Sequence, residues 1–267
     1  MPLFHLFLVA VIQGITEFLP ISSSGHLILL PNLTGMADQG LVIDVAVHVG
    51  TLFAVVLYFW SDVRAAALGS LRLLRGKVDT PGAFLALCLI VATIPVVIAG
   101  LAMKLTGLND AMRSTAVIGW TMLIFGIVLY FADQKAAETR KAEEWSLKHA
   151  IIMGLWQVIA LIPGTSRSGI TITGARTLGY EREGAAKLSM LMSIPTIAMA
   201  GMLLGLDVIG EGNAAVAKDG AIAAGFAFVS ALLALTLMMR LLRSVSFTPY
   251  VIYRIVFGII LLGVAYL

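Results

Sequence analysis

Residues 13–26 carry the sequence Gln-Gly-Ile-Thr-Glu-Phe-Leu-Pro-Ile-Ser-Ser-Ser-Gly-His, which interrupts a long apolar stretch near the N-terminus. A second apolar stretch is interrupted by Pro-Gly-Thr-Ser-Arg-Ser-Gly at residues 163–169. In hydrocarbon, a broken backbone is tolerated only where protein buries it or where it lines a polar cavity. We therefore interpret the regions of about 3–34 and 150–178 as re-entrant helical hairpins, each leaving the membrane on the side where it entered.

The composition indicates that lipid is the surrounding solvent. The chain has 267 residues, of which 60% are hydrophobic and 12% charged, whereas soluble domains carry about 25% charged residues. The predicted fold is therefore an all-α integral membrane protein with six transmembrane helices plus the two re-entrant hairpins. The six runs that approach the roughly 20 residues of a bilayer crossing are approximately 41–60, 84–102, 114–132, 185–206, 219–239 and 249–267.

Other features exclude further classes of protein. The net charge of +3 is small and scattered, so we expect no nucleic-acid partner. The single cysteine, Cys88, lies in an apolar run and excludes a disulfide framework. The N-terminus lacks a basic segment and a small-residue cleavage site, so we expect no removable signal peptide.

The basic residues predict the sidedness of the loops. With the hairpins placed as above, most arginines and lysines fall on one side, which the positive-inside rule makes cytoplasmic. Both termini then lie on the extracytoplasmic side. The cytoplasmic set comprises Arg64, Arg72, Arg75, Lys77, Lys135, Arg140, Lys141, Lys148, Arg176, Arg182, Lys187, Arg240, Arg243 and Arg254, against Lys104, Arg113 and Lys218 on the other side.

The order of one broken segment followed by three spans occurs twice. Gln13 and Gln157, for example, are 144 residues apart. Because three spans are an odd number, the second copy must be inverted, which gives repeats at 1–133 and 149–267 joined by a cytoplasmic linker, 134–148. Inverted repeats with broken helices place binding sites near the membrane midplane. We therefore expect the tips of the two hairpins to meet.

The remaining charged residues receive structural interpretations. The charged run 133–148 is expected to be a solvated loop, and Asp38, Arg182 and Glu183 are expected to anchor span ends. Asp44 and His48 are four residues apart on one helix face, where they are expected to pair with each other; a part in the functional site is the less favoured alternative.

The first break carries several groups that can support chemistry. Gln13 and Glu17 share a helix face, and a carboxylate in an apolar segment needs a cation or a proton. Ser22–Ser24 lie where a new helix starts and leaves N–H groups free to bind an anion. His26 follows within one turn and can carry a proton near neutral pH. Helix capping and a structural histidine are alternatives for these residues taken singly.

The second break contributes a cation. Arg167 is flanked by Ser166 and Ser168, and every other basic residue is assigned to a loop or a span end. We therefore expect Arg167 to stand alone at membrane depth. It would pair with Glu17, grip a phosphate through its planar fork of donors, or do both.

Together these groups suit a phosphorylated head group on an apolar body. Phosphoryl transfer needs charge neutralisation and a nucleophile, and Arg167 supplies the first. Glu17 could hold a divalent metal, and Ser22, Ser23 or His26 could be the nucleophile.

At these residues the sequence resembles the undecaprenyl-diphosphate phosphatase, or bacitracin-resistance, family. The family's first motif is a glutamate or glutamine, three residues and a glutamate, which matches 13–17. Its second motif, Pro-Gly-x-Ser-Arg-Ser-Gly, matches 163–169. Smaller similarities at Arg182 to Pro195 and at Phe247 to Arg254 extend the resemblance over essentially the whole chain.

The resemblance implies an enzyme of the bacterial inner membrane that removes the terminal phosphate of undecaprenyl diphosphate and so recycles the carrier lipid of cell-wall synthesis. It implies a site open to the periplasm and a divalent cation, Mg²⁺ or Ca²⁺, held by Glu17 with Gln13. The glutamine at position 13 removes one charge from the family pattern. The implied catalytic residues are Glu17, Ser22, Ser23, His26 and Arg167, and the expected phosphate-binding residues are Arg167, Thr165, Ser166, Ser168, Ser24 and Gly25. The expected partners are the polyprenyl diphosphate, membrane lipids and a second copy in a homodimer.

Two rival functions can be compared with this prediction. Ser24-Gly25-His26 is similar to a run in phosphatases of the phosphatidic-acid type, but no histidine follows Arg167, so their second catalytic histidine is missing. A transporter or flippase of the carrier lipid is the rival from another class, because inverted repeats with broken helices are a transporter architecture.

Overall fold

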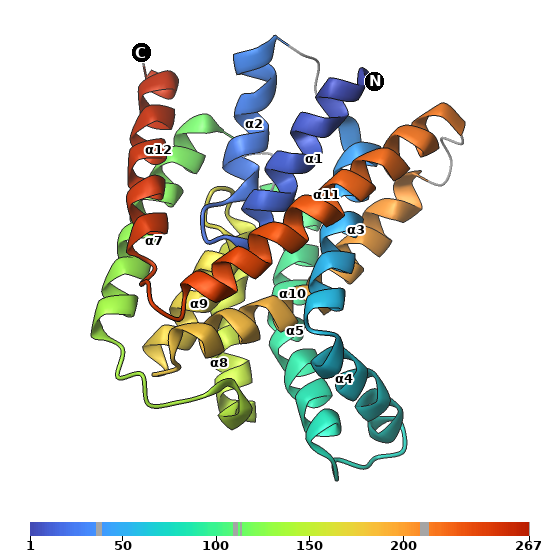
Figure 1. Ribbon diagram of the computed structural model, residues 1–267, viewed down its shortest axis with the longest axis vertical. Helices are drawn as coiled ribbons and strands as arrows, with labels where there is room; N and C mark the ends of the chain where they lie inside the picture. Colours follow the sequence, from blue (N-terminus) through green and yellow to red (C-terminus); the bar gives the residue numbers. More distant parts are fainter. Residues whose placement is uncertain (36–38, 109–111, 113, 209–213, 267) are drawn as a thin grey trace.

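The computed structural model of the chain describes residues 1–35, 39–108, 112, 114–208 and 214–266 (Figure 1). Over these residues the protein is built of helices, and the only bridge of β type joins Arg140 to Tyr180. The α-helices are α1 (Leu3–Phe18), α2 (Ser23–Thr34), α3 (Gly40–Tyr58), α4 (Trp60–Leu73), α5 (Pro81–Thr106), α7 (Thr115–Lys135), α8 (Leu147–Val158), α9 (Arg167–Thr177), α10 (Arg182–Val208), α11 (Ala214–Leu241) and α12 (Thr248–Tyr266), with 3-10 turns η1 (Ala142–Glu144) and η2 (Ile159–Leu161).

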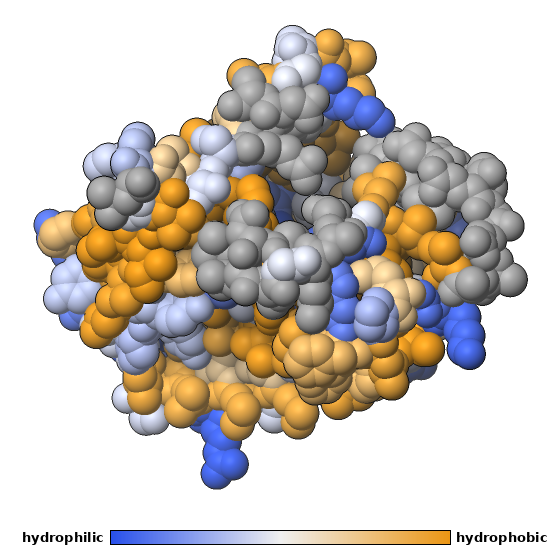
Figure 2. Space-filling model, turned by 90° about the horizontal axis from the view of Figure 1, so that it is seen from above, coloured by the Kyte–Doolittle hydropathy of each residue, from blue (hydrophilic) through white to orange (hydrophobic). Residues whose placement is uncertain are grey.

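Six helices in the described part of the chain are long and apolar enough to cross a bilayer, which confirms the predicted number of spans. They are Gly40–Tyr58, Pro81–Thr106, Thr115–Lys135, Arg182–Met202, Val216–Leu241 and Thr248–Tyr266. Seen from above in Figure 2, apolar side chains cover much of the outer surface, as lipid contact requires. The chain is thus a multi-pass membrane protein.

The second span is longer than the predicted 84–102 because both of its ends are capped. Thr80 accepts a hydrogen bond from the Ala83 N–H, and Pro81 occupies the first helical position, where proline is favoured. At the other end Gly107 has a φ of 69°, the left-handed conformation that commonly ends a helix.

Helix α4 was not predicted, because it is too polar to register as a span. It packs against α5, and the contact is close enough to require glycine on both sides. A Cβ atom on Gly69 would lie 2.3 Å from the Gly82 carbonyl, and one on Gly82 would lie 2.3 Å from the Ala65 carbonyl. The α4–α5 pair projects at the end of the molecule opposite both chain termini (Figure 1).

The broken segments pack against helices of the other half of the sequence. Helix α1 lies against α11, and α8 lies against α5. Helices α3 and α10 pack against each other, and α7 packs against α12. In Figure 1 the α1–α2 pair occupies the end that carries the termini, whereas α8 and α9 lie toward the opposite end.

Buried ion pairs join the charged run to the second half of the chain. Asp133 is only 2% exposed and binds Arg176 and Arg182, each at 2.9 Å, so the prediction that 133–148 is a fully solvated loop is wrong at its first residue. Arg176, which we assigned to a loop, is fully buried in α9. Of the predicted anchors, Arg182 holds Asp133, Glu183 binds Arg243 at 3.0 Å, and Asp38 lies outside the described residues.

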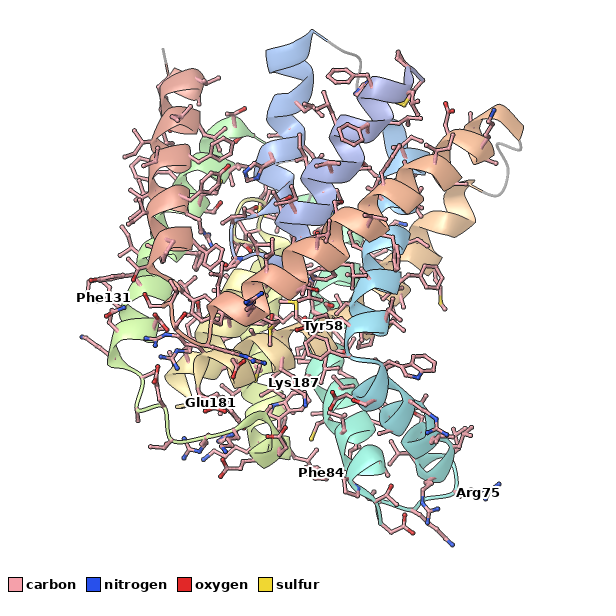
Figure 3. All side chains as sticks on the ribbon, in the orientation of Figure 1. Tyr58, Arg75, Phe84, Phe131, Glu181 and Lys187 are labelled. Atoms are coloured by element: carbon pink, nitrogen blue, oxygen red, sulfur yellow. The ribbon has the colours of Figure 1, made fainter. Side chains whose placement is uncertain are left out.

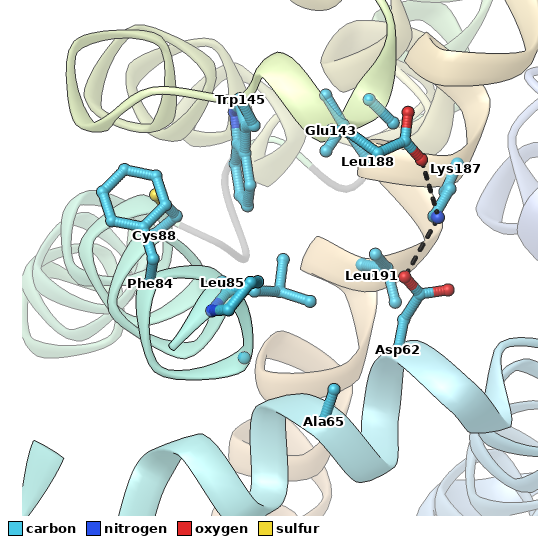
Figure 4. Close-up of a pocket in the computed structure, with 13 residues that line it drawn as sticks. Asp62, Ala65, Phe84, Leu85, Cys88, Glu143, Trp145, Lys187, Leu188 and Leu191 are labelled. Atoms are coloured by element: carbon cyan, nitrogen blue, oxygen red, sulfur yellow. Dashed lines mark hydrogen bonds and ion pairs between the residues drawn. The ribbon is translucent and has the colours of Figure 1, made fainter. Parts of the chain in front are cut away.

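A second ionic contact ties α4 to α10. Lys187 lies 3.0 Å from Asp62 and 3.3 Å from Glu143, at the edge of a cavity of about 220 Å³ lined mainly by apolar side chains (Figure 4). A backbone hydrogen bond, and then the charge of Lys187, hold the pKa of Glu143 below its usual value.

Candidate active site

The first break is a short extended link with one strained residue. Helix α1 ends at Phe18, where Leu19 turns to an extended conformation ahead of Pro20. Ser22 then adopts a φ of 73°, and α2 begins at Ser23. A left-handed backbone at a residue other than glycine costs of the order of 1–3 kcal/mol and persists only where the surroundings impose it.

The second break repeats this geometry. After η2 the chain turns through Gly164, with a φ of 84°, and Ser166, with a φ of 70°. Ser166 caps α9 by accepting a hydrogen bond from the Gly169 N–H at 3.1 Å, so the helix begins at Arg167.

The two breaks meet, which confirms the prediction made from their sequences. Arg167 Nη2 donates to Glu17 Oε1 at 2.8 Å across 150 residues of sequence. The Gly164 N–H donates to Ser24 Oγ at 3.3 Å, and Ser168 Oγ donates to the Leu19 carbonyl at 3.0 Å. Three separate contacts thus fix one break against the other.

Glu17 is the centre of the polar cluster. Its second oxygen, Oε2, accepts hydrogen bonds from Gln13 Nε2 at 2.9 Å and from Ser23 Oγ at 3.0 Å. His48 Nε2 lies 3.8 Å from the same oxygen. The Glu17 side chain is 8% exposed, so a carboxylate that is nearly removed from solvent is stabilised by one guanidinium and two neutral donors.

A small cavity of about 140 Å³ opens between the breaks. Its lining comprises Glu17, Ser22, Ser23, Ser24, Ala160, Gly164, Ser166 and Arg167. Nη1 of Arg167 is buried and has no hydrogen-bond partner among the described residues. An unpaired guanidinium nitrogen beside hydroxyl groups is a site for an anion, and phosphate oxygens suit its geometry.

The other expected phosphate-binding residues lie behind this lining. Thr165 and Ser168 are buried, and the Ser168 hydroxyl is committed to the Leu19 carbonyl. Gly25 packs against α7, where a Cβ atom would lie 2.9 Å from Met122 Sδ. These three residues support the walls of the cavity rather than form its surface.

His26 has both ring nitrogens engaged outside the cluster. Its Nδ1 lies 2.7 Å from the Ser22 carbonyl and its Nε2 lies 2.5 Å from the Tyr253 hydroxyl. The ring also stacks on Phe257, with centroids 4.6 Å apart. His26 therefore adjoins the backbone of the serine turn, and its ring contacts side chains of α12.

Comparison with known proteins shows the family of the chain. Residues 6–260 match the family model described as bacitracin resistance protein BacA. The chain belongs to this family. Proteins named undecaprenyl-diphosphatase from Roseobacter denitrificans and Dinoroseobacter shibae are 74% and 73% identical to it over 266 residues, which cover the whole of each chain. One named undecaprenyl-diphosphatase 1 from Rhodospirillum rubrum is 46% identical over all of this chain and 96% of its own.

The BacA resemblance implies a divalent cation, and the oxygens near Glu17 fit one only in part. Gln13 Oε1 is buried without a hydrogen-bond partner in the described structure, as an oxygen ligand would be before it binds a metal. However, no group of three His, Cys, Asp or Glu side chains that could hold a metal occurs among the described residues. The residues present therefore fit a cation that takes its remaining ligands from a bound phosphate and water.

Sequence reasoning missed two residues of this BacA site. His48, expected to pair with Asp44, has its Nδ1 2.7 Å from the Asp44 backbone carbonyl and its Nε2 3.8 Å from Glu17 Oε2. The spacing of four residues was a usable signal, because it put both side chains on one face, but it did not say which neighbour that face meets.

Arg254 is the larger omission. It was assigned to a cytoplasmic span end, yet it is fully buried in α12 and contradicts the prediction that Arg167 is alone at depth. Its guanidinium donates to the carbonyls of Thr165 at 2.8 Å, Gly164 at 3.3 Å and Pro20 at 3.5 Å, and so binds both breaks. It also donates to the Met122 and Thr121 carbonyls of α7. The family similarity at Phe247 to Arg254 was a usable signal that this residue matters, but it did not show where the side chain lies.

Proposed function

We propose that the protein is an undecaprenyl-diphosphatase, which hydrolyses the terminal phosphate of undecaprenyl diphosphate to give undecaprenyl phosphate and inorganic phosphate. The observation that carries the proposal is the unpaired Nη1 of Arg167 in a cavity that also contains Ser23 bound to Glu17. A site that only binds phosphate would need Arg167 and no nucleophile. The serine beside a carboxylate supplies a nucleophile and a base. The names of the close relatives support the same activity.

In the proposed mechanism, Ser23 Oγ attacks the terminal phosphorus while its proton passes to Glu17, 3.0 Å away, which then gives it to the phosphate oxygen of the leaving lipid monophosphate. The bond from that phosphorus to the bridging oxygen breaks, and the lipid monophosphate leaves. Water then attacks the phosphoserine, which releases inorganic phosphate and restores the serine. Arg167 stabilises the charge on the transferred group.

His26 has an alternative role in this scheme. The sequence made it an acid or base for the serine, the nucleophile itself, or an activator of water for direct attack, but its ring nitrogens lie against the Ser22 carbonyl and Tyr253. The contact of Ser23 with Glu17 favours the serine, with His26 holding the serine turn. A phosphoenzyme would separate the two assignments, since phosphohistidine is labile in acid and phosphoserine is not.

A divalent cation, Mg²⁺ or Ca²⁺, completes the proposed site. Glu17 would hold it together with the free oxygen of Gln13. When bound, such a cation neutralises charge on the diphosphate oxygens.

We also propose the membrane arrangement of two re-entrant hairpins in an inverted repeat. Ser22 and Ser166 are 144 residues apart and share the same unusual φ. The contacts Ser22 to Ser24 and Ser166 to Ser168 are both 3.1 Å, and each hairpin packs against a helix of the other half. These equivalences support a common ancestry of the halves.

The proposal sets the active site toward the periplasm, with both termini on that side of the bacterial inner membrane. Both termini lie at the same end of the molecule, as their placement on one side of the membrane requires (Figure 1). We also propose that the protein forms a homodimer. One face of α5 offers an apolar contact surface, made of the exposed side chains of Ile90, Ile94 and Ile98. Light scattering of the purified protein would measure the number of copies.

The decisive experiment is phosphate release from undecaprenyl diphosphate by the protein purified in detergent. Turnover without a membrane would exclude a pure flippase. Complete inactivity in the presence of both magnesium and calcium would contradict the phosphatase.

A further inference from the structure

A second cavity, of about 560 Å³, lies far from the proposed active site, between the end of α7 and the turn that joins α9 to α10. One part of its lining is apolar and the other part is basic. The apolar part includes Val128, Phe131, Ala132 and Leu178, and the basic part includes Lys135 and Arg140.

The apolar and basic residues that α7 contributes to the lining follow one another along the helix. The apolar span of α7 ends at Lys135, so Val128 and Phe131 belong to its last two turns. Phe131 is 53% exposed and points away from the helix bundle in Figure 3. The cavity therefore begins in the hydrocarbon layer and ends at its polar boundary, as the surface of an amphiphilic ligand does.

The two cations are held in place without carboxylate partners. Arg140 is fixed by its backbone, which pairs with Gly179 and Glu181, and its guanidinium donates to the Leu178 carbonyl. Lys135 lies over the Phe131 ring, 5.6 Å from its centre. Within the described structure neither side chain forms a salt bridge.

The neighbouring charges cancel one another. Asp133 and Glu138 are each bound by Arg176 and Arg182 at 2.7–3.2 Å, which leaves this group of four neutral. Lys135 and Arg140 therefore give the cavity its net positive charge, and no acidic residue is part of its described lining.

We propose that this cavity binds an anionic phospholipid, with its phosphate between Lys135 and Arg140 and an acyl chain along Val128 and Phe131. A basic pocket at the end of a span is suited to such head groups. A zwitterionic lipid would bring an ammonium group that finds no carboxylate on the lining. The site is separate from the proposed phosphatase and does not depend on it.

Native mass spectrometry of the full chain in detergent tests the proposal, with dioctanoyl-phosphatidylglycerol as the probe and dioctanoyl-phosphatidylcholine as the comparison. We expect preferential binding of phosphatidylglycerol. The double substitution K135Q/R140Q should lower its affinity about 25-fold, from roughly fivefold for each cation. The matched control is R64Q/R75Q, which removes two exposed cations from α4 and the turn after it, distant from Phe131 in Figure 3.

Three results would overturn the site: equal loss in both double variants, no loss in K135Q/R140Q, or equal binding of the two lipids. Competition with inorganic phosphate tests whether the cavity recognises the whole lipid or only its phosphate group. Phosphate at millimolar concentration should not displace the lipid, and Phe131→Ala should weaken lipid binding several-fold; displacement by phosphate with no effect of Phe131→Ala would contradict the lipid assignment. If K135Q/R140Q has a lower thermal midpoint because Arg140 loses its contact with the Leu178 carbonyl, the single variant Lys135→Gln tests the site, with Arg75→Gln as its control.

Discussion

Ser22 and Ser166 stand 144 residues apart and are both held at positive φ, at 73° and 70°. Each lies immediately before the first residue of a helix that starts in the middle of the molecule, and each hydroxyl contacts the serine two residues later. The same strained turn thus presents Ser23 from one half of the chain and Arg167 from the other. Contacts between the breaks maintain the strained backbone. The same contacts therefore determine both the stability of the turn and the geometry of the site.

This relationship predicts different effects of alanine and glycine at position 166. Ser166→Ala keeps the unfavourable φ and loses the cap of α9, so it should destabilise the protein by about 1 kcal/mol or more. Ser166→Gly also loses the hydroxyl but adopts positive φ without strain, so it should cost only a few tenths of a kcal/mol. Thermal unfolding of the two purified variants in detergent measures the difference. Equal midpoints would show that the backbone at Ser166 is not strained.

The second prediction concerns Arg167, which binds Glu17 with one nitrogen and leaves another free. Arg167→Ala should lower kcat/KM for undecaprenyl diphosphate by roughly 10²–10³-fold, the usual effect of removing a transition-state donor. Arg167→Lys keeps the charge but loses the planar fork, so it should recover only part of this loss. Phosphate release measures both, and Arg240→Ala, at an exposed cation near the end of α11, is the control. Full activity in Arg167→Lys would rule out the assignment in which one nitrogen of Arg167 holds Glu17 while another binds phosphate.

A third prediction distinguishes the roles of Ser23 and Ser24 in the first break. Ser23→Ala should reduce turnover by roughly 10³-fold or more, because it removes the proposed nucleophile. Ser24→Ala removes the acceptor of the Gly164 N–H and the hydroxyl that contacts Ser22, but no proposed reacting atom, and should reduce turnover by roughly tenfold or less. Rapid acid quenching during turnover should trap phosphate on Ser23 of the unsubstituted protein. Acid-labile phosphate on a histidine would instead make His26 the nucleophile.

The cation can be tested through the glutamine at position 13. Chelation by EDTA should abolish activity, and added Mg²⁺ or Ca²⁺ should restore it. Gln13→Glu replaces the amide, whose oxygen is free, with a carboxylate beside Glu17 and should lower the metal concentration for half-maximal activity by roughly tenfold. The titration of activity with metal measures this shift. Gln157→Glu, at the equivalent buried position of the second half, should leave the metal dependence unchanged.

The sequence predicted the parts of the fold and site that have strong local signals. Apolar length located the six spans, and the proline, glycine and serine residues located the breaks. The requirement that a buried carboxylate find a cation predicted the contact of Glu17 with Arg167. Helix α4 escaped prediction because a short polar helix has no comparable signal. His48 and Arg254 escaped because their roles depend on how separate helices pack, which spacing along one helix does not reveal.

Arg254 provides the last prediction, because its guanidinium binds both breaks and α7 together. Its removal would leave several buried carbonyls without a donor, and each such loss costs about 1–3 kcal/mol. Arg254→Ala should therefore lower the thermal midpoint by roughly 5–10 °C and reduce kcat. Because Arg254 is not part of the cavity lining, Arg254→Lys should recover much of the stability while kcat recovers less, since one ammonium cannot span the carbonyls of Pro20 and Thr165 at once. Thermal unfolding and separate measurement of kcat and KM test this difference. If stability and kcat recover in parallel, Arg254 has a structural role only and does not position the site.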